Sequence, residues 1–260
     1  MRCTETQPLS TSEQLYQDRA HIAMSPGLAN GGIALAVIEP DLIGWDQIEE
    51  LLCTYGFIAF GAAHKVQFTK SLKLQYGDDI ELPFWDTFIG DQSDAYPVCA
   101  SCLAHPQTPQ WRLFSTQTPT ARIIETVRTL NERVGVAPLP DWYMRGEGPP
   151  SLTSWIEDEA GEMVACANGS MRYHEESRLA GVYYVGSVSV GSGNRGKGLG
   201  TLVTALSIRD GIDEFRCKKI MGIAQPSNAP SRAMLERCGL LVDPERATII
   251  LNKSGAFQTR

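Results

Sequence analysis

The stretch VGSGNRGKGLGT, residues 190–201, decides how this sequence is interpreted, because its glycines fit three patterns at once. Gly191 to Gly196 has the spacing G-x-G-x-x-G of a dinucleotide-binding loop. Gly191 to Lys197 has the spacing G-x-x-x-x-G-K that begins a P-loop. Arg195 to Gly200 has a third spacing, R-x-x-G-x-G. All three place backbone amides beside an anion, so the question is which anion.

The first two patterns lack the partners that their chemistry needs. A dinucleotide fold has an acidic residue near the end of the next strand, which binds the ribose. Here that strand, predicted over 218–225, ends in Gln225. A P-loop has Ser or Thr after its lysine to hold Mg²⁺, but Gly198 follows Lys197. The stretch is more typical of a pyrophosphate cradle at the start of a helix, and a glycine-rich turn with solvated charges stays open.

Hydrophobic periodicity predicts alternating elements in the second half of the chain. Helices are expected over 118–135, 198–215 and 228–239, and strands over 151–159, 162–174, 182–190, 218–225 and 247–253. The order is therefore β-β-β-α-β-α-β. In the first half a strand is expected over 33–40 and a helix over 41–56, whereas residues 57–117 show no motif.

Two motifs in the second half resemble the GNAT superfamily, whose members move acetyl or related acyl groups from CoA to amines. The strand VGSVSV and the following Arg195 to Thr201 are similar to the signature V-x-x-x-x-R-x-x-G-x-G/A. Asn228-Ala229-Pro230-Ser231, continuing to Leu240, is similar to the second CoA-side helix of the family. The resemblance covers about residues 118–260. It implies an α/β (α+β) fold, a mixed and mostly antiparallel sheet flanked by helices, with an additional N-terminal region.

We divide the chain accordingly into three parts. Residues 1–28 are expected to be a polar N-terminal tail, and residues 118–260 a GNAT acetyltransferase domain. Residues 29–117 are expected to be an N-terminal domain that walls the acceptor site. Its fold is left open between a degenerate copy of the same fold and a long insertion.

The resemblance implies which residues bind acetyl-CoA. The backbone of the loop would hold the pyrophosphate, and it comprises Arg195, Gly196, Lys197, Gly198, Leu199, Gly200 and Thr201. Val188 and Val190 would pair with the pantetheine arm where two strands splay apart. The Val188 N–H would polarise the thioester carbonyl as negative charge develops there. Asn228 and Ser231 would lie beside the pantetheine.

The acid and the base are less well defined by the resemblance. Many relatives carry a proton-donating Tyr where this chain has Leu235. Tyr183, Tyr184 or a water molecule is then the candidate donor. The amine nucleophile must also lose a proton before it attacks. Candidates for that base are His174, Glu175 and Glu176, and the catalytic set we predict is Val188, Tyr184, Glu176 and His174.

The function expected from these motifs is acetyl transfer from acetyl-CoA to a primary amine of a small molecule or peptide. Two alternatives stay open. One is a non-catalytic module that binds or senses acyl-CoA, which Leu235 favours. The other is a nucleotide-binding protein. The acceptor is not named by any motif, and a homodimer is left open.

Composition excludes several classes of protein. Residues 1–117 hold 6 basic and 14 acidic side chains, and the whole chain of 260 residues has a net charge of −7. This is not the basic footprint of a nucleic-acid-binding protein. An acidic first half could attract a cationic amine, or it is only a solvated surface. Without a long apolar run or a signal-peptide core, we expect a cytoplasmic protein with no membrane partner.

The seven cysteines are scattered, which argues against a disulfide framework. Cys99 and Cys102 form a C-x-x-C pair with His105 nearby, resembling half of a zinc site. A structural zinc site needs four ligands, and no second pair exists in the sequence. We therefore expect reduced thiols and no bound metal.

Overall fold

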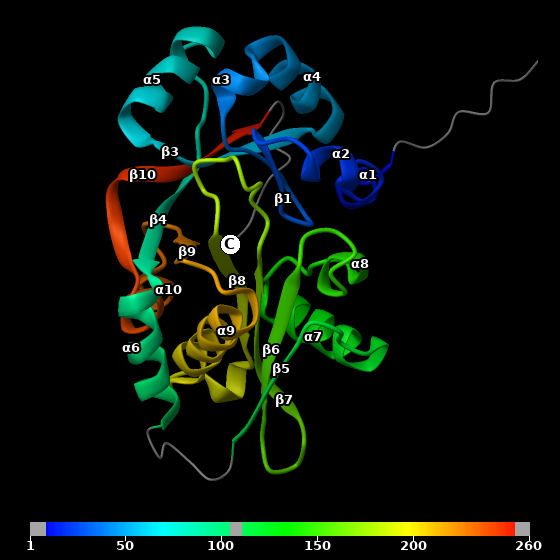
Figure 1. Ribbon diagram of the computed structural model, residues 1–260, viewed down its shortest axis with the longest axis vertical. Helices are drawn as coiled ribbons and strands as arrows, with labels where there is room; N and C mark the ends of the chain where they lie inside the picture. Colours follow the sequence, from blue (N-terminus) through cyan, green and yellow to red (C-terminus); the bar gives the residue numbers. More distant parts are fainter. Residues whose placement is uncertain (1–8, 105–110, 253–260) are drawn as a thin grey trace, which may run out of the picture.

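The computed structural model describes residues 9–104 and 111–252, and within them the strands join in one continuous sheet (Figure 1). The strands are β1 (Leu28–Asn30), β2 (Leu35–Val37), β3 (Phe57–His64), β4 (Phe84–Asp91), β5 (Arg112–Thr116), β6 (Ser151–Glu157), β7 (Met163–Ser170), β8 (Val182–Val190), β9 (Lys219–Ala224) and β10 (Leu241–Asn252). Their order in the sheet is β1-β2-β3-β10-β4-β9-β8-β7-β6-β5. Only β2–β3 and β8–β9 pair in parallel among these strands.

Helices cover both faces of this sheet. They are α1 (Thr11–Gln17), α2 (Arg19–Ala23), α3 (Pro40–Ile43), α4 (Trp45–Tyr55), α5 (Lys65–Tyr76), α6 (Gln92–Ala104), α7 (Ala121–Val134), α8 (Asp141–Met144), α9 (Leu199–Phe215) and α10 (Ala229–Arg237), with a 3-10 turn η1 (Ser192–Asn194). The expected mixed, mostly antiparallel sheet flanked by helices is confirmed.

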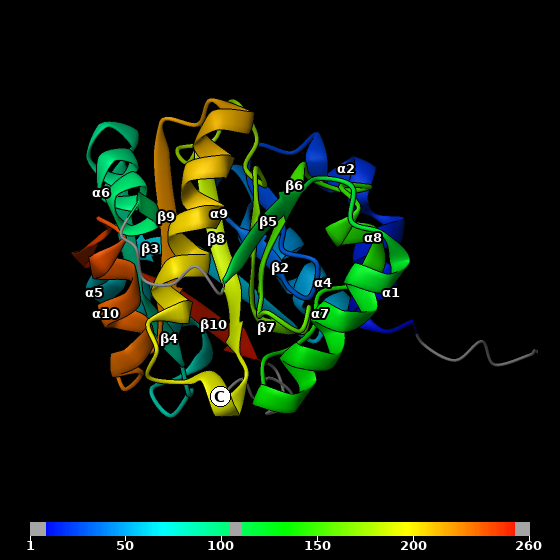
Figure 2. The same ribbon diagram turned by 90° about the horizontal axis from the view of Figure 1, so that it is seen from below.

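Alternation along β6 shows how α7 and α9 take opposite faces. Trp155 packs in a cluster with α7, whereas the next residue, Ile156, packs in a cluster with α9. Successive side chains of a strand point to opposite faces, so the two helices sandwich the strands (Figure 2). Helix α7 begins at the N-cap Thr120 and ends at Gly135, whose φ of 79° suits a glycine.

The first half of the chain contributes strands to the same sheet as the second half. β4 lies between β9 and β10 and pairs antiparallel with both. β10 also pairs with β3, so the last strand of the chain joins strands from both halves. The boundary proposed at residue 117 stays a prediction, and no break in the sheet accompanies it.

Several elements of the first half differ from the sequence-based expectation. Residues 1–28 were expected as a polar tail, but residues 11–23 form α1 and α2, which bury Leu15 and Ile22. The single helix expected over 41–56 is two helices, because Gly44 adopts a φ of 80° between them. Residues 57–104, which showed no motif, form β3, α5, β4 and α6.

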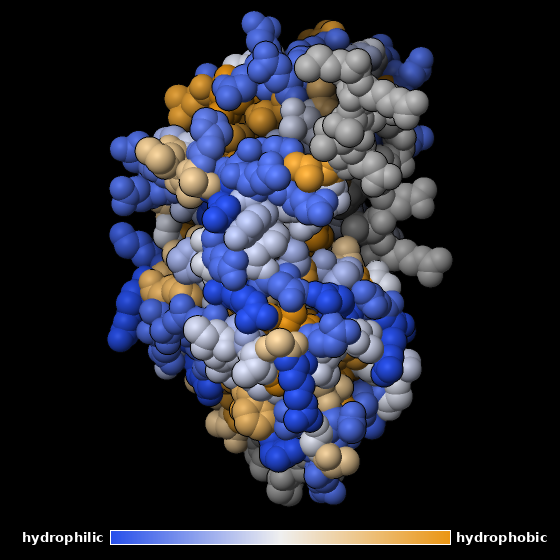
Figure 3. Space-filling view, turned by 90° about the vertical axis from the view of Figure 1, so that its right-hand side faces the viewer, coloured by the Kyte–Doolittle hydropathy of each residue, from blue (hydrophilic) through white to orange (hydrophobic). Residues whose placement is uncertain are grey.

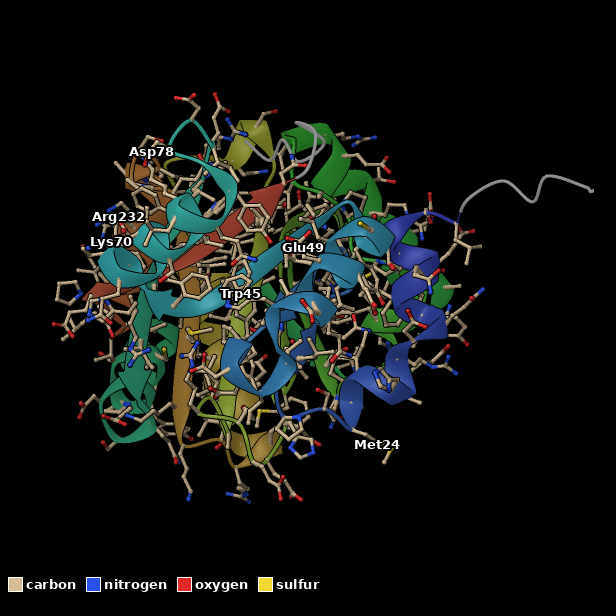
Figure 4. All side chains as sticks on the ribbon, turned by 90° about the horizontal axis from the view of Figure 1, so that it is seen from above. Met24, Trp45, Glu49, Lys70, Asp78 and Arg232 are labelled. Carbon is tan, nitrogen blue, oxygen red and sulfur yellow. The ribbon has the colours of Figure 1, made fainter. Side chains whose placement is uncertain are left out.

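Helices α3, α4 and α5 cover one end of the molecule (Figure 4). Trp45 of α4 reaches inward, and its ring centroid lies 6.2 Å from that of Phe60 on β3. Met24, which follows α2, points away from the molecule and is 80% exposed. The face in Figure 3 is mostly hydrophilic, with one hydrophobic patch toward the end where α3 to α5 lie and smaller ones scattered over the rest.

The described helices include none with both the length and the apolar character that crossing a bilayer requires. Lys253 of the last expected strand, and residues 1–8 of the expected tail, lie outside the described residues.

Candidate active site

Strands β8 and β9 pair over only three residues and then separate. The parallel pairing runs from Val182 to Tyr184 on β8 and ends at Met221 on β9. Beyond Tyr184, a cavity of about 300 Å³ lies along the separated strands. Backbone groups of Val185 to Val188 face this space without β9 as a sheet partner. An extended ligand can therefore lie between the two strands.

A β-bulge changes the direction of β8 inside the cavity. Gly186 pairs with Asn168 and Ser189 with Cys166, so two residues of β8 oppose one residue of β7. Ser187, the first of the two, has a φ of 50°, which is rare for a residue with a side chain. Bulges leave one residue unpaired and re-aim the backbone, which is why they occur beside active sites. Val188, expected to bind the thioester, is the second bulge residue and lines the cavity.

The glycine-rich loop follows β8 and opens helix α9. Gly196 and Gly198 have φ values of 78° and 77°, a conformation that glycine adopts without strain. A Cβ added to Gly196 would meet no atom within 4 Å, so the space beside it is open. Lys197 donates from Nζ to Asn194 Oδ1 over 2.8 Å, and Arg195 is exposed. The first backbone N–H groups of α9 carry partial positive charge, which favours an anion here.

Helix α10 borders the cavity from the β9 side. The Asn228 side chain accepts from the Ser231 N–H at 3.1 Å and caps the helix. Asn228 and Ser231 line the cavity together with Leu235, which is 3% exposed. Of the predicted CoA-side residues, Val188, Asn228 and Ser231 line this cavity, whereas Val190 and the loop Arg195 to Thr201 are not among its lining residues. The apolar Leu235 side chain packs near Gly222 and cannot donate a proton.

The two tyrosines that begin β8 point in opposite directions. Tyr183 is fully buried on the α9 side, where its hydroxyl lies 3.1 Å from Ser207 Oγ. It is not among the residues that line the cavity. Tyr184 is partly buried and lines the cavity. Burial raises the pKa of Tyr184 above its ordinary value, although the nearby Arg172 cation opposes this, so the phenol keeps its proton at neutral pH.

The loop between β7 and β8 holds the three residues expected as bases. His174 accepts at Nδ1 from the Glu176 N–H over 3.1 Å, and Glu175 and Glu176 are exposed. None of them lines the main cavity. His174 and Glu175 instead line a second cavity of about 360 Å³, beside α2 and β1. The assignment of His174 and Glu176 as bases stays a prediction.

Arg172 and Tyr173 stand where the two cavities meet, since both residues line each of them. Sequence patterns did not single them out, because they follow the end of β7 and belong to no motif. The Arg172 guanidinium carbon lies 3.7 Å from the ring centroid of Tyr184. An isolated bridge between Ala29 and Tyr173 holds this segment against the first half of the chain.

Residues of the first half also line the main cavity, and no sequence motif indicated which residues these are. They come from the β1–β2 turn and from β2, β3 and β4, and include Gly31, Ala36, Ala59, Gly61 and Trp85. Apart from Trp85, these are glycines and alanines, which leave room next to the separated strands. Strand pairing across more than 100 residues brings them there, and such contacts leave no local pattern.

The C-x-x-C pair lies away from this cavity. The Cys99 thiol is buried and donates to the Cys238 carbonyl, and the Cys102 thiol donates to the Arg237 carbonyl. Within residues 9–104 and 111–252, no three His, Cys, Asp or Glu side chains gather as metal ligands would. His105 lies outside the described residues.

Comparison with known proteins places this geometry in a family. Residues 113–240 match the model of the family described as "Acetyltransferase (GNAT) family". No curated protein matches the chain.

Similar solved structures extend the likeness beyond the matched segment. A GCN5-related N-acetyltransferase from Kribbella flavida is 13% identical, with 96% of this chain and 98% of that chain covered, at a TM-score of 0.60. A tandem GNAT protein from the clavulanic acid biosynthesis pathway is 13% identical, covering 88% and 78%, at 0.58. A Drosophila protein is 17% identical, covering 86% and 72%, at 0.53. At these identities the likeness concerns the fold.

Proposed function

Residues 113–240 belong to the GNAT acetyltransferase family, and from this premise we propose that the protein moves an acetyl group from acetyl-CoA to a primary amine by direct attack. The observation that carries the proposal is the separation of β8 from β9 beyond Tyr184, directly before a glycine-rich loop that opens α9. This arrangement supplies an extended slot and an anion cradle in line with each other.

The residues fit the co-substrate at both ends. At the loop, open space beside Gly196 and the N-terminus of α9 suit a pyrophosphate, with Arg195 and Lys197 adding positive charge. In the slot, the Val188 and Val190 backbone would pair with the pantetheine amides. Asn228 and Ser231 of α10 would border the arm from the other side.

Transfer then needs little from the protein beyond positioning and one hydrogen bond. The amine lone pair forms an N–C bond to the thioester carbon, and the carbonyl oxygen gains negative charge. The Val188 N–H donates to that oxygen and stabilises it. The C–S bond breaks next, and the sulfur leaves with the bonding electrons as a thiolate. The attacking nitrogen loses its proton, and the product is an amide.

Proton transfer is the step with the fewest candidates in this cavity. Among its described lining residues there is neither a carboxylate nor an imidazole. We propose that water carries the amine proton to solvent. Tyr184 is the proposed donor to the thiolate, because its phenol lines the cavity and keeps its proton at neutral pH. A thiolate is also a tolerable leaving group without help.

The first half of the chain is proposed to form the acceptor side of the site. Gly31, Ala59 and Trp85 line the cavity opposite the CoA-side helix α10. The pyrophosphate loop, by contrast, belongs wholly to residues 190–201. CoA binding and acceptor choice would then be divided between the two halves.

The rival function is a module that binds acyl-CoA without turnover. Leu235 and the missing carboxylate in the described cavity lining favour it. Two measurements separate the hypotheses. Calorimetric titration with acetyl-CoA, NADH and Mg-ATP tests the loop, and micromolar binding of acetyl-CoA alone is expected. Thiol release from acetyl-CoA with a panel of amines then tests turnover, and binding without release from any amine would favour the sensor.

A further inference from the structure

Arg172 lies at the inner wall of the cavity and is held in place by neighbours that do not neutralise it. Its Nε donates to Ser170 Oγ over 3.0 Å, and Ser170 Oγ lies 2.8 Å from the Tyr143 hydroxyl. The guanidinium stacks over Tyr184. Ser170 and Tyr143 are fully buried, so this chain of contacts fixes the guanidinium in one orientation.

The charge of Arg172 has no counter-charge in the described part of the chain. None of the ion pairs between described residues includes it. It is also the one charged side chain among the described residues that line the main cavity. Burial acts to lower its pKa, but the three surrounding tyrosines raise it above the ordinary value, so the group stays cationic.

A partly buried cation without a carboxylate is costly unless something completes it. The guanidinium fork presents five donors, and its hydrogen-bond partners among the described residues include Ser170 Oγ and the Tyr143 side chain, so donors remain for a ligand. Its Nη1 lies against Gly31, where a Cβ would come within 3.4 Å, on the acceptor side of the cavity. Arg172 and Gly31 both line the main cavity, so this side chain can reach a ligand held there.

We propose that the amine acceptor carries a carboxylate, and that Arg172 binds this carboxylate through its terminal nitrogens. The inference rests on the proposed acetyl transfer and names the substrate class: an amino acid or short peptide, rather than a polyamine or a neutral amine. A carboxylate matches the planar fork bidentately. A polyamine would instead bring positive charge against the Arg172 cation.

The dimensions agree with an acceptor of this size. Tyr184, beneath Arg172, lies four residues before Val188, which is at most about 13 Å along a strand, because the bulge at Ser187 shortens the rise. A hydrogen bond of about 3 Å to the carboxylate and an attack distance of about 3 Å leave at most roughly 7 Å between carboxylate and amine. That span is the length of one or two amino-acid residues.

The first experiment compares matched acceptors with the full-length protein. Each amino acid or dipeptide is assayed beside its C-terminal amide, which keeps the amine but removes the negative charge. We expect kcat/KM for the acid to exceed that for the amide by about 10- to 100-fold, the range of a charge-assisted hydrogen-bonded pair. Equal rates for acids and amides, or a preference for polyamines, would overturn the inference while leaving acetyl transfer intact.

Variants test the residue itself. Arg172→Gln should lower kcat/KM for the acid to that for the amide, with acetyl-CoA binding unchanged, and Arg172→Lys should give an intermediate value. Arg122→Gln, on the exposed face of α7, removes the same charge and should change neither rate. If Arg172→Gln leaves the acid-to-amide ratio as it is in the parent protein, the assignment is wrong.

A binding readout keeps this inference separable from the proposed function. The probe is an N-acetyl amino acid, the product of the proposed reaction, titrated by calorimetry into the CoA-bound protein. Binding that weakens at least tenfold in Arg172→Gln supports the carboxylate site even if no amine is turned over. If no amine is acetylated, the proposed function is wrong, but the carboxylate site is not affected. If the product binds equally well to the parent protein and to Arg172→Gln, the carboxylate site is wrong.

Discussion

Substituting Gly196 by alanine tests whether the loop after β8 holds a pyrophosphate. Gly196 has a φ of 78°, and a Cβ there would meet no atom within 4 Å. Gly56, which ends α4 in the first half, has a φ of 77° and the same open surroundings. The two positions are therefore matched in backbone conformation and in space. They differ in that only Gly196 lies in the proposed cradle.

The matched pair separates strain from ligand contact. Alanine in the left-handed region costs about 1–2 kcal/mol, so both variants should lose a similar amount of unfolding free energy. Only Gly196→Ala should also lose acetyl-CoA affinity, because its methyl group occupies space that a phosphate would enter. Losing one charge-assisted hydrogen bond of about 1.5–3 kcal/mol corresponds to roughly 10- to 150-fold in Kd.

Two assays measure the stability of each variant and its affinity for acetyl-CoA. Urea unfolding without ligand gives the stability of each variant, and calorimetric titration with acetyl-CoA gives Kd. Gly56→Ala should bind as the parent protein does. If Gly196→Ala binds acetyl-CoA with parental affinity while its stability falls like that of Gly56→Ala, the loop does not hold the pyrophosphate.

Three further predictions follow from the cavity and the sheet. Tyr184→Phe should lower kcat at least tenfold at unchanged acetyl-CoA affinity. Because burial raises the Tyr184 pKa, the kcat of the parent protein should show no loss from tyrosine ionisation up to about pH 9. Gly200→Ala should raise unfolding free energy by up to about 1 kcal/mol in a urea titration, since its Cβ meets Met234 only at 3.5 Å and alanine favours the helix. A fragment beginning at residue 118 should lack cooperative unfolding, because β4 would be missing between β9 and β10; a folded fragment that binds CoA would contradict this.

Local patterns in the second half predicted its elements because each one is bounded by residues with a physical role. Thr120 and Gly135 bracket α7, and Asn228 caps α10, as their positions in the sequence indicate. The glycine loop was equally readable, since positive φ at Gly196 and Gly198 restricts those positions to glycine. Such signals depend on only a few neighbouring residues, so they can be recognised from the sequence without a structure.

The first half was hard to predict because its elements lack those signals. The run FIAFGAAH of β3 is apolar up to its last residue, His64, and periodicity cannot tell a buried strand from a buried helix. Helix α6 contains Pro97, which usually ends a helix. The place of β4 between β9 and β10 depends on partners more than 120 residues away. No property of residues 84–91 alone indicates it.

The residues of the candidate site differ in the same way: some follow from a local sequence pattern, and others do not. The CoA-side residues could be predicted from the sequence because phosphate binding needs glycines, and glycines leave a recognisable spacing; their role stays a prediction. Arg172 was not predicted, because an arginine after a strand is ordinary in a sequence. It draws attention only through its surroundings in the fold: it lines a cavity, lies among three tyrosines, and has no carboxylate partner among the described residues. Acceptor recognition uses ordinary residues brought together by the fold, so substrate choice is the property that sequence patterns reveal last. For this chain, the structure places the Arg172 cation in the wall of the cavity, and the proposal built on it makes the acceptor's charge a measurable question.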